Sequence, residues 1–382
     1  MHILIDAHLA VKKIDGVSRY LIGLLSELPQ IDKSIRYTIL SLPLEESGLP
    51  DQIFAHPNVR RVILNLMGPS PKQHFFARRL VKELNVDLYH HPQFDLPFGV
   101  QVPKVVTIHD LMYVFHPEFL FKASKLKRFY IEQCLKYTAK HADRIIAVSE
   151  SIRQDLTRRF AVKPERVKVI YNGVTIPNST QTDGASTTTD LSNDFILFAG
   201  ARRPHKNIQG LIKALAILRN ERNIKLDLVV AGQPYSTFKE PETLAEQLGV
   251  KEHVHLLDFV SDGPLQSLYK RAKLVAVPSF YEGFGLPVVE AMAYGKPVIA
   301  SNVSALPEIV GDAGLLVDPH DPVDIASKIQ QIVADKHLAE QLSQRALQRA
   351  KLFSWQKMAE ATLQVYLQAL KARRANKSLS YA

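Results

Sequence analysis

Short apolar runs alternate with amphipathic stretches along almost the whole of this 382-residue chain. Apolar runs such as Ile3–Ile5 and Leu274–Val277 have the length and the β-branched composition of buried strands. The stretches between them place apolar residues at helical spacing, for example over 17–29, 72–84 and 124–142. Such alternation favours parallel sheets that are covered by helices on both faces. The sequence therefore predicts an α/β fold.

The predicted elements fall into two halves that are separated by a polar run. Residues 178–190 are rich in Ser, Thr and Asp, so burial cannot offset the entropy of ordering them. We expect a first domain over 1–177, a linker over 178–193 and a second domain over 194–355. Ligands of open parallel sheets bind beyond the carboxyl ends of the strands, so the expected site is a cleft between the domains. The predicted strands are 3–5, 37–40, 61–64, 86–89, 105–108, 144–148, 195–198, 226–230, 254–257, 274–277, 297–300 and 315–317.

The charge balance is basic, which favours an anionic partner. The chain has 48 Lys and Arg against 38 Asp and Glu, a formal net charge of +10. Two groups hold part of the excess, and they are either solvated helix faces or a surface for reversible contact with an anionic membrane. We expect no nucleic-acid partner, because neither group has interleaved aromatic residues or a recognition motif. The groups are Arg78-Arg79 and Lys122, Lys125, Lys127 and Arg128.

The apolar pattern predicts neither a membrane-spanning helix nor a signal peptide. No run of about 18 apolar residues is present. The first residues lack a basic segment and a long apolar core, and they are expected to form the first strand. The single cysteine, Cys134, excludes an internal disulfide and is typical of a reducing compartment. We therefore expect a cytoplasmic protein, with a peripheral position at the inner face of the membrane as an option.

Two glutamates, Glu282 and Glu290, flank a glycine-rich loop that follows a predicted strand. Pro287 is placed for the first turn of a helix, where its missing N–H has no cost. A strand, a glycine loop and a helix start together present backbone amides and the positive end of a helix dipole to an anion. The two carboxylates can then hold the hydroxyls of a sugar nucleotide while the amides hold its phosphate. The structural alternative is a surface loop in which Glu290 only caps or solvates a helix.

Three further groups of residues stand at the ends of predicted strands. Arg202, Arg203 and Lys206 carry positive charges that can neutralise a departing diphosphate, or else they form a basic loop in which Asn207 caps the next helix. His109 can hydrogen-bond a sugar hydroxyl, or it is a structural histidine paired with Asp110. Gly16, in the loop before the first helix, allows backbone to approach a phosphate closely.

Several common active-site patterns are absent from the sequence. There is no Asp-x-Asp pair of the kind that chelates a metal-bound diphosphate, so we expect no metal and no cofactor. The loop around Gly16 is not a G-x-G-x-x-G fingerprint, which counts against a nicotinamide dinucleotide. Patterns typical of α/β-hydrolases, P-loop proteins and zinc proteases are missing as well.

Taken together, these residues resemble the retaining glycosyltransferases with the GT-B fold, known as group 1 or family four. The resemblance covers nearly the whole chain and is strongest from Phe195 to Asp324, including the segment Ala305–Gly314. It implies two Rossmann-like domains that face a central cleft, and transfer of a sugar from a nucleotide donor with retention at the anomeric carbon. The tail over 356–382 is similar to the family's last helix, which crosses back to the first domain.

The resemblance also implies roles for individual residues. Glu282 is expected to meet donor-sugar hydroxyls, and Glu290 the ribose hydroxyls. Lys206 with Arg202 or Arg203 is expected to bind the diphosphate; many relatives have an arginine where this chain has His205. His109 and Gly16 match first-domain positions that approach the sugar and the diphosphate. The backbone of the glycine loop should contact the diphosphate or sugar, through Gly283, Phe284, Gly285 and Leu286.

The expected function is hexose transfer to a glycan or lipid-linked acceptor during the synthesis of a cell-surface polysaccharide such as lipopolysaccharide. GDP-mannose is the preferred donor, and a UDP-hexose such as UDP-glucose is the alternative. Other readings are an epimerase or phosphorylase of the same fold, a non-catalytic GT-B binding protein, and a membrane-recruited scaffold. The acceptor, the linkage and the oligomeric state do not follow from the sequence.

Overall fold

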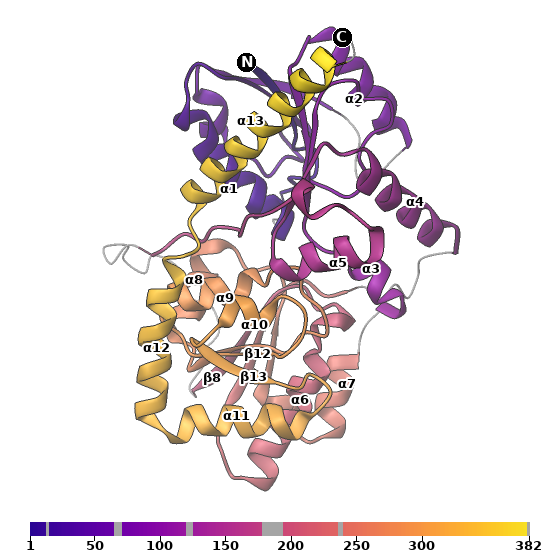
Figure 1. Cartoon of the computed structure of the whole chain (residues 1–382). Coiled ribbons are helices and arrows are strands. Elements are labelled where there is room, and N and C mark those ends of the chain that lie inside the picture. Colours follow the sequence, from indigo (N-terminus) through magenta and orange to yellow (C-terminus); the bar gives the residue numbers. More distant parts are fainter. Residues whose placement is uncertain (13–14, 65–70, 120–124, 178–193, 236–239, 380–382) are drawn as a thin grey trace. The chain divides into compact units, whose positions relative to one another are not determined.

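The computed structural model describes residues 1–382 except 13–14, 65–70, 120–124, 178–193, 236–239 and 380–382. The chain divides into two compact units (Figure 1). Unit 1 consists of Met1–Gly173 together with Ser354–Ala382, and unit 2 consists of Val174–Phe353. The predicted linker over 178–193 lies outside the described residues.

Unit 1 is built on a parallel sheet whose described strands lie in the order β3-β2-β1-β4-β5-β6-β7. Its central strands are rich in Ile, Leu and Val and almost fully buried, as expected where helices cover both faces of a parallel sheet. The order reverses between β1 and β4, which makes that pair the switch point of the sheet. The strands are β1(His2–Asp6), β2(Arg36–Ser41), β3(Val59–Ile63), β4(Leu88–His91), β5(Lys104–Ile108), β6(Arg144–Ala147) and β7(Val167–Val169).

Two helices of unit 1 begin at residues with clear capping roles. Asp15 caps the first helix, because its carboxylate accepts a hydrogen bond from the amide of Ser18 at 2.9 Å. Ser149 caps another through the amide of Ile152 at 3.2 Å. The helices are α1(Gly16–Ile31), α2(Pro71–Glu83), α3(Met112–Phe115), α4(Lys125–His141), α5(Glu150–Phe160) and α13(Trp355–Leu379).

The last helix, α13, belongs to unit 1 and lies along α1 (Figure 1). Its Met358 and Tyr366 are buried in the same apolar core as the inner face of α1. Trp355 packs where two glycines leave room for it. A Cβ at Gly23 would come 2.2 Å from the indole ring, and one at Gly173 would come 2.3 Å from the backbone nitrogen of Trp355. Close approach of backbone and ring therefore fixes the start of α13.

Unit 2 is built on a second parallel sheet, whose described strands lie in the order β10-β9-β8-β11-β12-β13. Its order reverses between β8 and β11. The strands are β8(Phe195–Ala199), β9(Asp227–Ala231), β10(Val254–Leu257), β11(Leu274–Val277), β12(Val298–Ser301) and β13(Gly314–Val317). The helices are α6(Ile208–Ala216), α7(Glu240–Gln247), α8(Asp262–Arg271), α9(Leu286–Ala293), α10(Leu306–Val310), α11(Pro322–Ala334) and α12(Lys336–Ala350).

The predicted α/β class with parallel sheets is confirmed, and two strand predictions need correction. The strand predicted at 86–89 lies at Leu88–His91 instead. Its last two residues stay in the sheet because their rings are buried and hydrogen-bonded, His90 to Thr107 and His91 to Asp95. The short edge strand β7 was not predicted. Among the described helices, none combines the length and the apolarity that a membrane span requires.

Candidate functional site

Two loops of unit 2 come together at the switch point of its sheet. β8 and β11 are hydrogen-bonded neighbours, and the strand order reverses between them. The loop after β8 contains the short helix η4(Pro204–Lys206), and the loop after β11 contains Glu282 and leads into α9. Doubly wound sheets bind nucleotides at this point, because neighbouring loops leave the sheet in opposite directions there.

Lys206 and Glu282, both predicted site residues, form an ion pair across these two loops. Lys206 Nζ lies 2.6 Å from Glu282 Oε1, and the hydroxyl of Ser279 donates to the same oxygen at 2.8 Å. The amide of Glu282 donates to Ser304 Oγ at 3.0 Å, so the backbone is held as well. Within the described part of the chain, Glu282 Oε2 makes no hydrogen bond. One carboxylate oxygen is therefore fixed, and the other keeps its capacity to accept from a ligand hydroxyl.

Asn207 holds the two loops against each other. Its side chain accepts from the amide of Gly210 at 3.1 Å, so the predicted helix cap of α6 is confirmed. The side-chain amide also donates to the carbonyl of Pro278 at 2.9 Å and to that of Pro319 at 2.7 Å. A further backbone bond joins Phe280 to His205 at 2.8 Å. Lys206 thus stands between two residues that tie its loop to the neighbouring one.

The glycine loop continues into α9 through Gly285, which has φ 97° and ψ 54°. A side chain would be strained at this φ, and a Cβ would also come 2.7 Å from Leu306 Cδ2. Phe284 is buried and packs edge-to-face on Phe353, with ring centroids 5.8 Å apart. Pro287 lies in the first turn, as predicted. The backbone from Gly283 to Leu286 therefore leads directly to a helix start of the kind that attracts anions.

Glu290 lies on α9 and is held by a tyrosine that the sequence did not reveal. The hydroxyl of Tyr269 donates to Glu290 Oε2 at 2.7 Å. The ring of Tyr269 is stacked on Tyr294, with centroids 5.4 Å apart and an interplanar angle of 3°. A rigid tyrosine pair therefore orients the carboxylate, which remains partly exposed. Tyr269 is 21 positions from Glu290 in sequence, and only the packing of α8 beside α9 brings them into contact.

The two predicted arginines stand in different surroundings. The buried Arg202 donates to the carbonyl of Gly232 at 3.1 Å and lies 2.6 Å from Asp258 and 3.3 Å from Glu242. Its guanidinium therefore ties the ends of β9 and β10 together. Arg203 is exposed and stands at the start of η4, directly before the residues that lead to Lys206. Of the two, only Arg203 has a side chain that is accessible to a ligand.

The predicted residues of unit 1, Gly16 and His109, lie at the same edge of its sheet. Gly16 is the first residue of α1, after the capping Asp15 and on the connection that follows β1. His109 follows β5 and packs edge-to-face on Tyr20, with ring centroids 4.6 Å apart. Among the described residues its Nε2 has no hydrogen-bond partner. The alternative pairing with Asp110 is not present, because His109 bonds the backbone of Pro92 while Asp110 accepts from the amide of Met112 at 3.3 Å.

A buried network of charged side chains at this edge escaped the sequence analysis. Asp6, at the end of β1, bonds His8 through one oxygen and accepts from Tyr89 at 2.7 Å through the other. His91, at the end of β4, lies 3.4 Å from Asp6 and 2.9 Å from Asp95. The network thus spans the switch point of unit 1. Alternating Asp and His in Asp6-Ala7-His8 was the only signal in the sequence, and it is shared with many ordinary strand ends.

The network fixes the charge state of His91. Burial lowers the pKa of this imidazole, but the hydrogen bonds and charges of Asp6 and Asp95 outweigh it and raise the pKa to about 9. Burial raises the pKa of Asp6, yet contacts with His8 and His91 bring it well below its usual range. Of the described carboxylates, none is hydrogen-bonded to His109, and burial lowers its pKa to about 4. At neutral pH, His91 is therefore a cation between two anions, and His109 is neutral.

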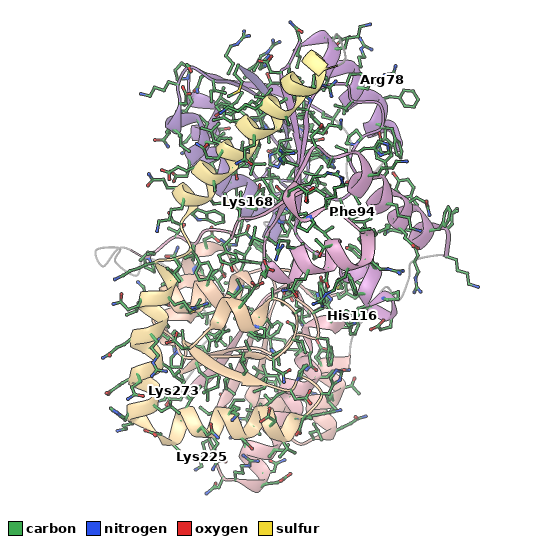
Figure 2. All side chains as sticks on the ribbon, in the orientation of Figure 1. Arg78, Phe94, His116, Lys168, Lys225 and Lys273 are labelled. Carbon is green, nitrogen blue, oxygen red and sulfur yellow. The ribbon has the colours of Figure 1, made fainter. Side chains whose placement is uncertain are left out.

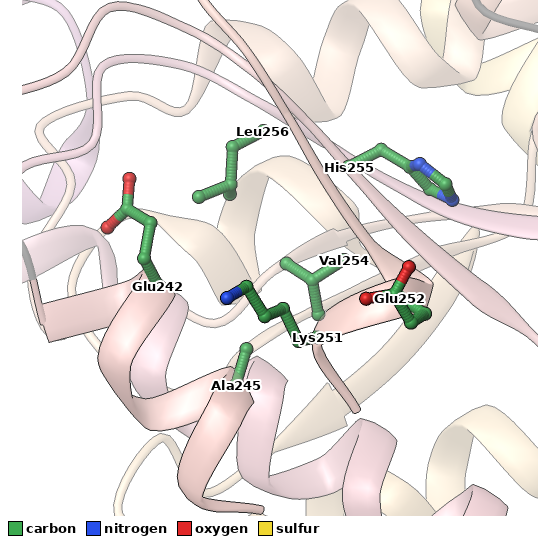
Figure 3. A pocket seen from close by; sticks show the side chains of 7 residues that line it. All are labelled: Glu242, Ala245, Lys251, Glu252, Val254, His255 and Leu256. Atoms are coloured by element: carbon green, nitrogen blue, oxygen red, sulfur yellow. The ribbon is translucent and has the colours of Figure 1, made fainter. Parts of the chain in front are cut away.

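A hollow of about 410 Å³ lies at the edge strand β10 (Figure 3). None of the predicted site residues lines it. Figure 3 shows the ammonium of Lys251 and the carboxylate of Glu242 on the same side of the hollow. Glu242 also forms an ion pair with Arg202, so its carboxylate already has a positively charged partner within unit 2. The hollow is lined by Glu242, Ala245, Lys251, Glu252, Val254, His255 and Leu256.

Both halves of the chain match known families. Residues 180–349 match the family described as Glycosyl transferases group 1, and residues 14–176 match Glycosyltransferase Family 4. The O-antigen chain mannosyltransferase B of Escherichia coli is 33% identical over 307 residues, which cover 78% of this chain and 77% of that protein. The chain belongs to the group 1 glycosyltransferases. The enzyme class predicted from the residues, a glycosyltransferase, is confirmed at this level.

Further relatives support the family and the fold of this glycosyltransferase. The MMP alpha-(1->4)-mannosyltransferase of Mycolicibacterium hassiacum is 34% identical over 62% of this chain, a match that spans only 56% of that protein. Among solved structures, sucrose-phosphate synthase from Thermosynechococcus elongatus aligns with TM-score 0.77 at 22% identity, covering 97% of this chain and 100% of its own. Anabaena HepE in complex with UDP-glucose aligns with TM-score 0.74 at 21% identity, covering 96% and 100%. The chain therefore has the GT-B fold.

Proposed function

We propose that this glycosyltransferase moves a hexose from a nucleotide-sugar donor to a glycan or lipid-linked acceptor of a cell-surface polysaccharide. The Lys206–Glu282 pair carries the proposal, because it puts a cation and a carboxylate 2.6 Å apart at the switch point of unit 2. Mannose is the preferred sugar and GDP-mannose the preferred donor, which the mannosyltransferases among the relatives support. A UDP-hexose is the alternative donor.

Each described side chain has a role that fits its surroundings. Lys206 and the exposed Arg203 neutralise the diphosphate, together with the backbone from Gly283 to Leu286 at the start of α9. Glu282 Oε2 accepts from sugar hydroxyls, since Oε1 is already held by Lys206 and Ser279. Glu290 accepts from the ribose hydroxyls while Tyr269 orients it. Arg202 positions the loop ends of β9 and β10 and does not touch the donor.

The proposed reaction retains the configuration at the anomeric carbon. The bond from that carbon to the diphosphate breaks, and the bond to the acceptor oxygen forms on the same face. The leaving phosphate oxygen takes the acceptor's proton, so no covalent intermediate with Glu282 is needed. Charge builds up on the departing diphosphate, where Lys206 and Arg203 stabilise it. Neutral His109 gives its one N–H to the Pro92 carbonyl, so its Nε2 can only accept from a sugar hydroxyl, and Gly16 lets backbone approach the diphosphate closely.

The test is a transfer assay with purified protein, a panel of labelled nucleotide sugars and a lipid-linked oligosaccharide acceptor. Lys206→Ala should lower kcat by roughly 100-fold or more, because a charge that stabilises the transition state is lost. Glu290→Gln should raise the donor Kd roughly tenfold and change kcat less, because it loses a charged contact to the ribose. The anomeric configuration of the product is read by NMR.

Matched controls are available on the same unit. Lys213→Ala on α6 and Glu246→Gln on α7 change exposed residues of the same types, and both should leave transfer unchanged. Near-normal rates in folded Lys206→Ala would refute the site. Binding of donor without transfer to any acceptor would favour a non-catalytic protein instead, and an inverted product would refute retention.

A further inference from the structure

Two helices of unit 1, α2 and α4, expose an unusual amount of apolar surface. On α2, Phe75 is 81% exposed and Phe76 is 47% exposed. On α4, Leu126 is 77% exposed and Phe129 is 60% exposed. Single exposed apolar residues are common on protein surfaces. Two large ones on each of two neighbouring helices are instead typical of an interaction surface. We call these four residues the anchor group.

α2 and α4 are in contact beside the anchor group. His74, next to Phe75, has its ring Nε2 3.3 Å from the hydroxyl of Tyr130, which is next to Phe129. The ring of Phe98 lies 4.3 Å from His74 and 4.3 Å from Tyr137, so it packs between the same two helices. The anchor group therefore belongs to two helices that touch through residues next to it in sequence. Figure 2 shows Phe94 inside unit 1 and Arg78 at the outer side of α2.

Positive charge surrounds the anchor group. The sequence of α2 contains four basic residues and one acidic residue, and that of α4 contains five and one. Seven of the ten excess positive charges of the chain are therefore on these two helices. Both acidic residues are paired within their own helix, Glu83 with Arg79 and Glu132 with Lys136. The exposed basic residues of the two helices are Arg78, Arg79, Lys82, Lys125, Lys127, Arg128, Lys136 and Lys140.

We propose that α2 and α4 form a docking surface for an anionic lipid membrane, with the anchor group inserted among the headgroups. Exposed Phe and Leu beside Lys and Arg are the pattern of interfacial helices, in which apolar side chains enter the lipid and cations meet its charged surface. The charges were evident from the sequence, whereas the exposure of Phe75, Phe76 and Phe129 is a property of the folded chain. This proposal rests on the proposed function, because a membrane-docking surface would bring the enzyme to a lipid-linked acceptor. Membrane binding itself requires no donor.

The test measures binding of the full chain to vesicles, without donor or acceptor. Vesicles of phosphatidylcholine and phosphatidylglycerol at about two to one should bind the protein, and vesicles of phosphatidylcholine alone should bind it at least roughly tenfold more weakly. The double variant Phe75→Ser with Leu126→Ser should lower the partition coefficient roughly tenfold. Lys82→Glu with Lys125→Glu should abolish the preference for anionic vesicles. Raising the salt concentration should weaken the binding of the unaltered protein.

Control residues that are also exposed and apolar lie elsewhere in the chain. Leu44 is 58% exposed and Leu352 is 59% exposed, so Leu44→Ser with Leu352→Ser removes exposed apolar side chains outside α2 and α4 and should leave binding unchanged. Lys225→Glu with Lys336→Glu, both in unit 2, makes the same change in net charge. Equal loss in the control and the test variants would overturn the proposal. So would tight binding of single-stranded DNA that Phe75→Ser with Leu126→Ser weakens as strongly as vesicle binding.

The vesicle assay is separable from the proposed reaction. With a water-soluble acceptor, Phe75→Ser with Leu126→Ser should transfer sugar at the rate of the unaltered protein, because no residue of the anchor group belongs to the donor site. If the proposed donor or the proposed reaction is wrong, the conclusion drawn from vesicle binding still holds. If vesicle binding fails while transfer to the soluble acceptor persists, the docking surface is refuted and the enzyme is not.

Discussion

At the scale of single residues, three histidines of unit 1 show how neighbours decide a charge state. His90 and His91 are adjacent on β4. Burial lowers the pKa of His90 to about 3, because its partners, Thr107 and Tyr366, are uncharged hydroxyls. Asp6 and Asp95 instead raise the pKa of His91 to about 9 against the effect of burial. Burial lowers the pKa of His109, which has no hydrogen-bonded carboxylate among the described residues, to about 4.

These shifts predict a maximum in the stability of unit 1 near pH 6.5. Below the unfolded value of 6.5, the unfolded chain protonates His90 and His109 before the folded chain does, so stability falls as pH falls. Above pH 6.5, folded unit 1 keeps the proton on His91 until about pH 9, whereas the unfolded chain loses it. The stability that protonated His91 contributes is therefore lost as pH rises from 6.5 to about 9. Urea unfolding followed by Trp355 fluorescence measures this, since Trp355 is the chain's single tryptophan and belongs to unit 1.

The variant His91→Asn tests the alkaline half of that curve. It should lower the free energy of unfolding most below pH 6.5 and remove the decline between 6.5 and 9. His116→Asn is the matched control, because the imidazole of His116 is partly exposed and bonds the exposed Glu118. A decline that persists unchanged in His91→Asn would show that another group causes it.

The two adjacent arginines give a second prediction at this scale. Arg203→Ala should weaken donor binding roughly tenfold and leave stability unchanged, because Arg203 is exposed. Arg202→Ala should lower the stability of unit 2 by about 1–3 kcal/mol, since the buried guanidinium satisfies the carbonyls of Gly232 and Leu257. Isothermal titration with donor and thermal unfolding separate the two effects. The reverse outcome would assign the second diphosphate charge to Arg202.

At the scale of elements, the sequence predicted the strand positions that depend on local composition. Apart from β4, apolar runs located the central strands to within one residue, because burial on both faces requires Ile, Leu and Val there. β4 was misplaced, because His90 and His91 are polar in composition but buried in a network. β7, with three residues at the edge of its sheet, is too short to give a pattern. Tyr269 and Asp95 acquire their roles only through packing, which no local pattern contains.

The seam between α1 and α13 gives a prediction at the same scale. Gly23 lies inside α1, where alanine would favour the helix by about 1 kcal/mol. A Cβ there would come 2.2 Å from the rigid indole of Trp355, and such overpacking costs about 1–3 kcal/mol. Gly23→Ala should therefore destabilise unit 1 and shift the fluorescence of Trp355. Ser26→Ala, a change to alanine elsewhere in α1, should do neither; stabilisation by Gly23→Ala would show that the ring moves aside without cost.

At the scale of the whole molecule, the two ends of the chain belong to one unit. The core of unit 1 joins residues near the start, such as Leu21 and Leu24, with Met358 and Tyr366 of α13. The core of unit 2 is drawn entirely from the continuous stretch between Ile196 and Leu342. Family resemblance predicted that the last helix crosses back, whereas composition alone could not, because amphipathic spacing does not say which sheet a helix covers.

This arrangement predicts that the halves differ when they are separated. Residues 174–353 should fold alone and unfold cooperatively, because they contain the whole core of unit 2. Residues 1–173 should be largely unfolded or aggregated, since without α13 the buried face of α1 is exposed to water. A peptide of residues 354–379 should have little helix alone and should become helical on binding fragment 1–173.

Circular dichroism of each fragment and Trp355 fluorescence of the peptide decide between the outcomes. The peptide carrying Trp355→Ala, followed by circular dichroism, is the matched control and should bind more weakly, because the indole fills the space left by Gly23 and Gly173. A stable, monomeric fragment 1–173 that ignores the peptide would mean that α13 merely covers unit 1. Recovery of folding only with the peptide would mean that α13 is required to complete the core of unit 1.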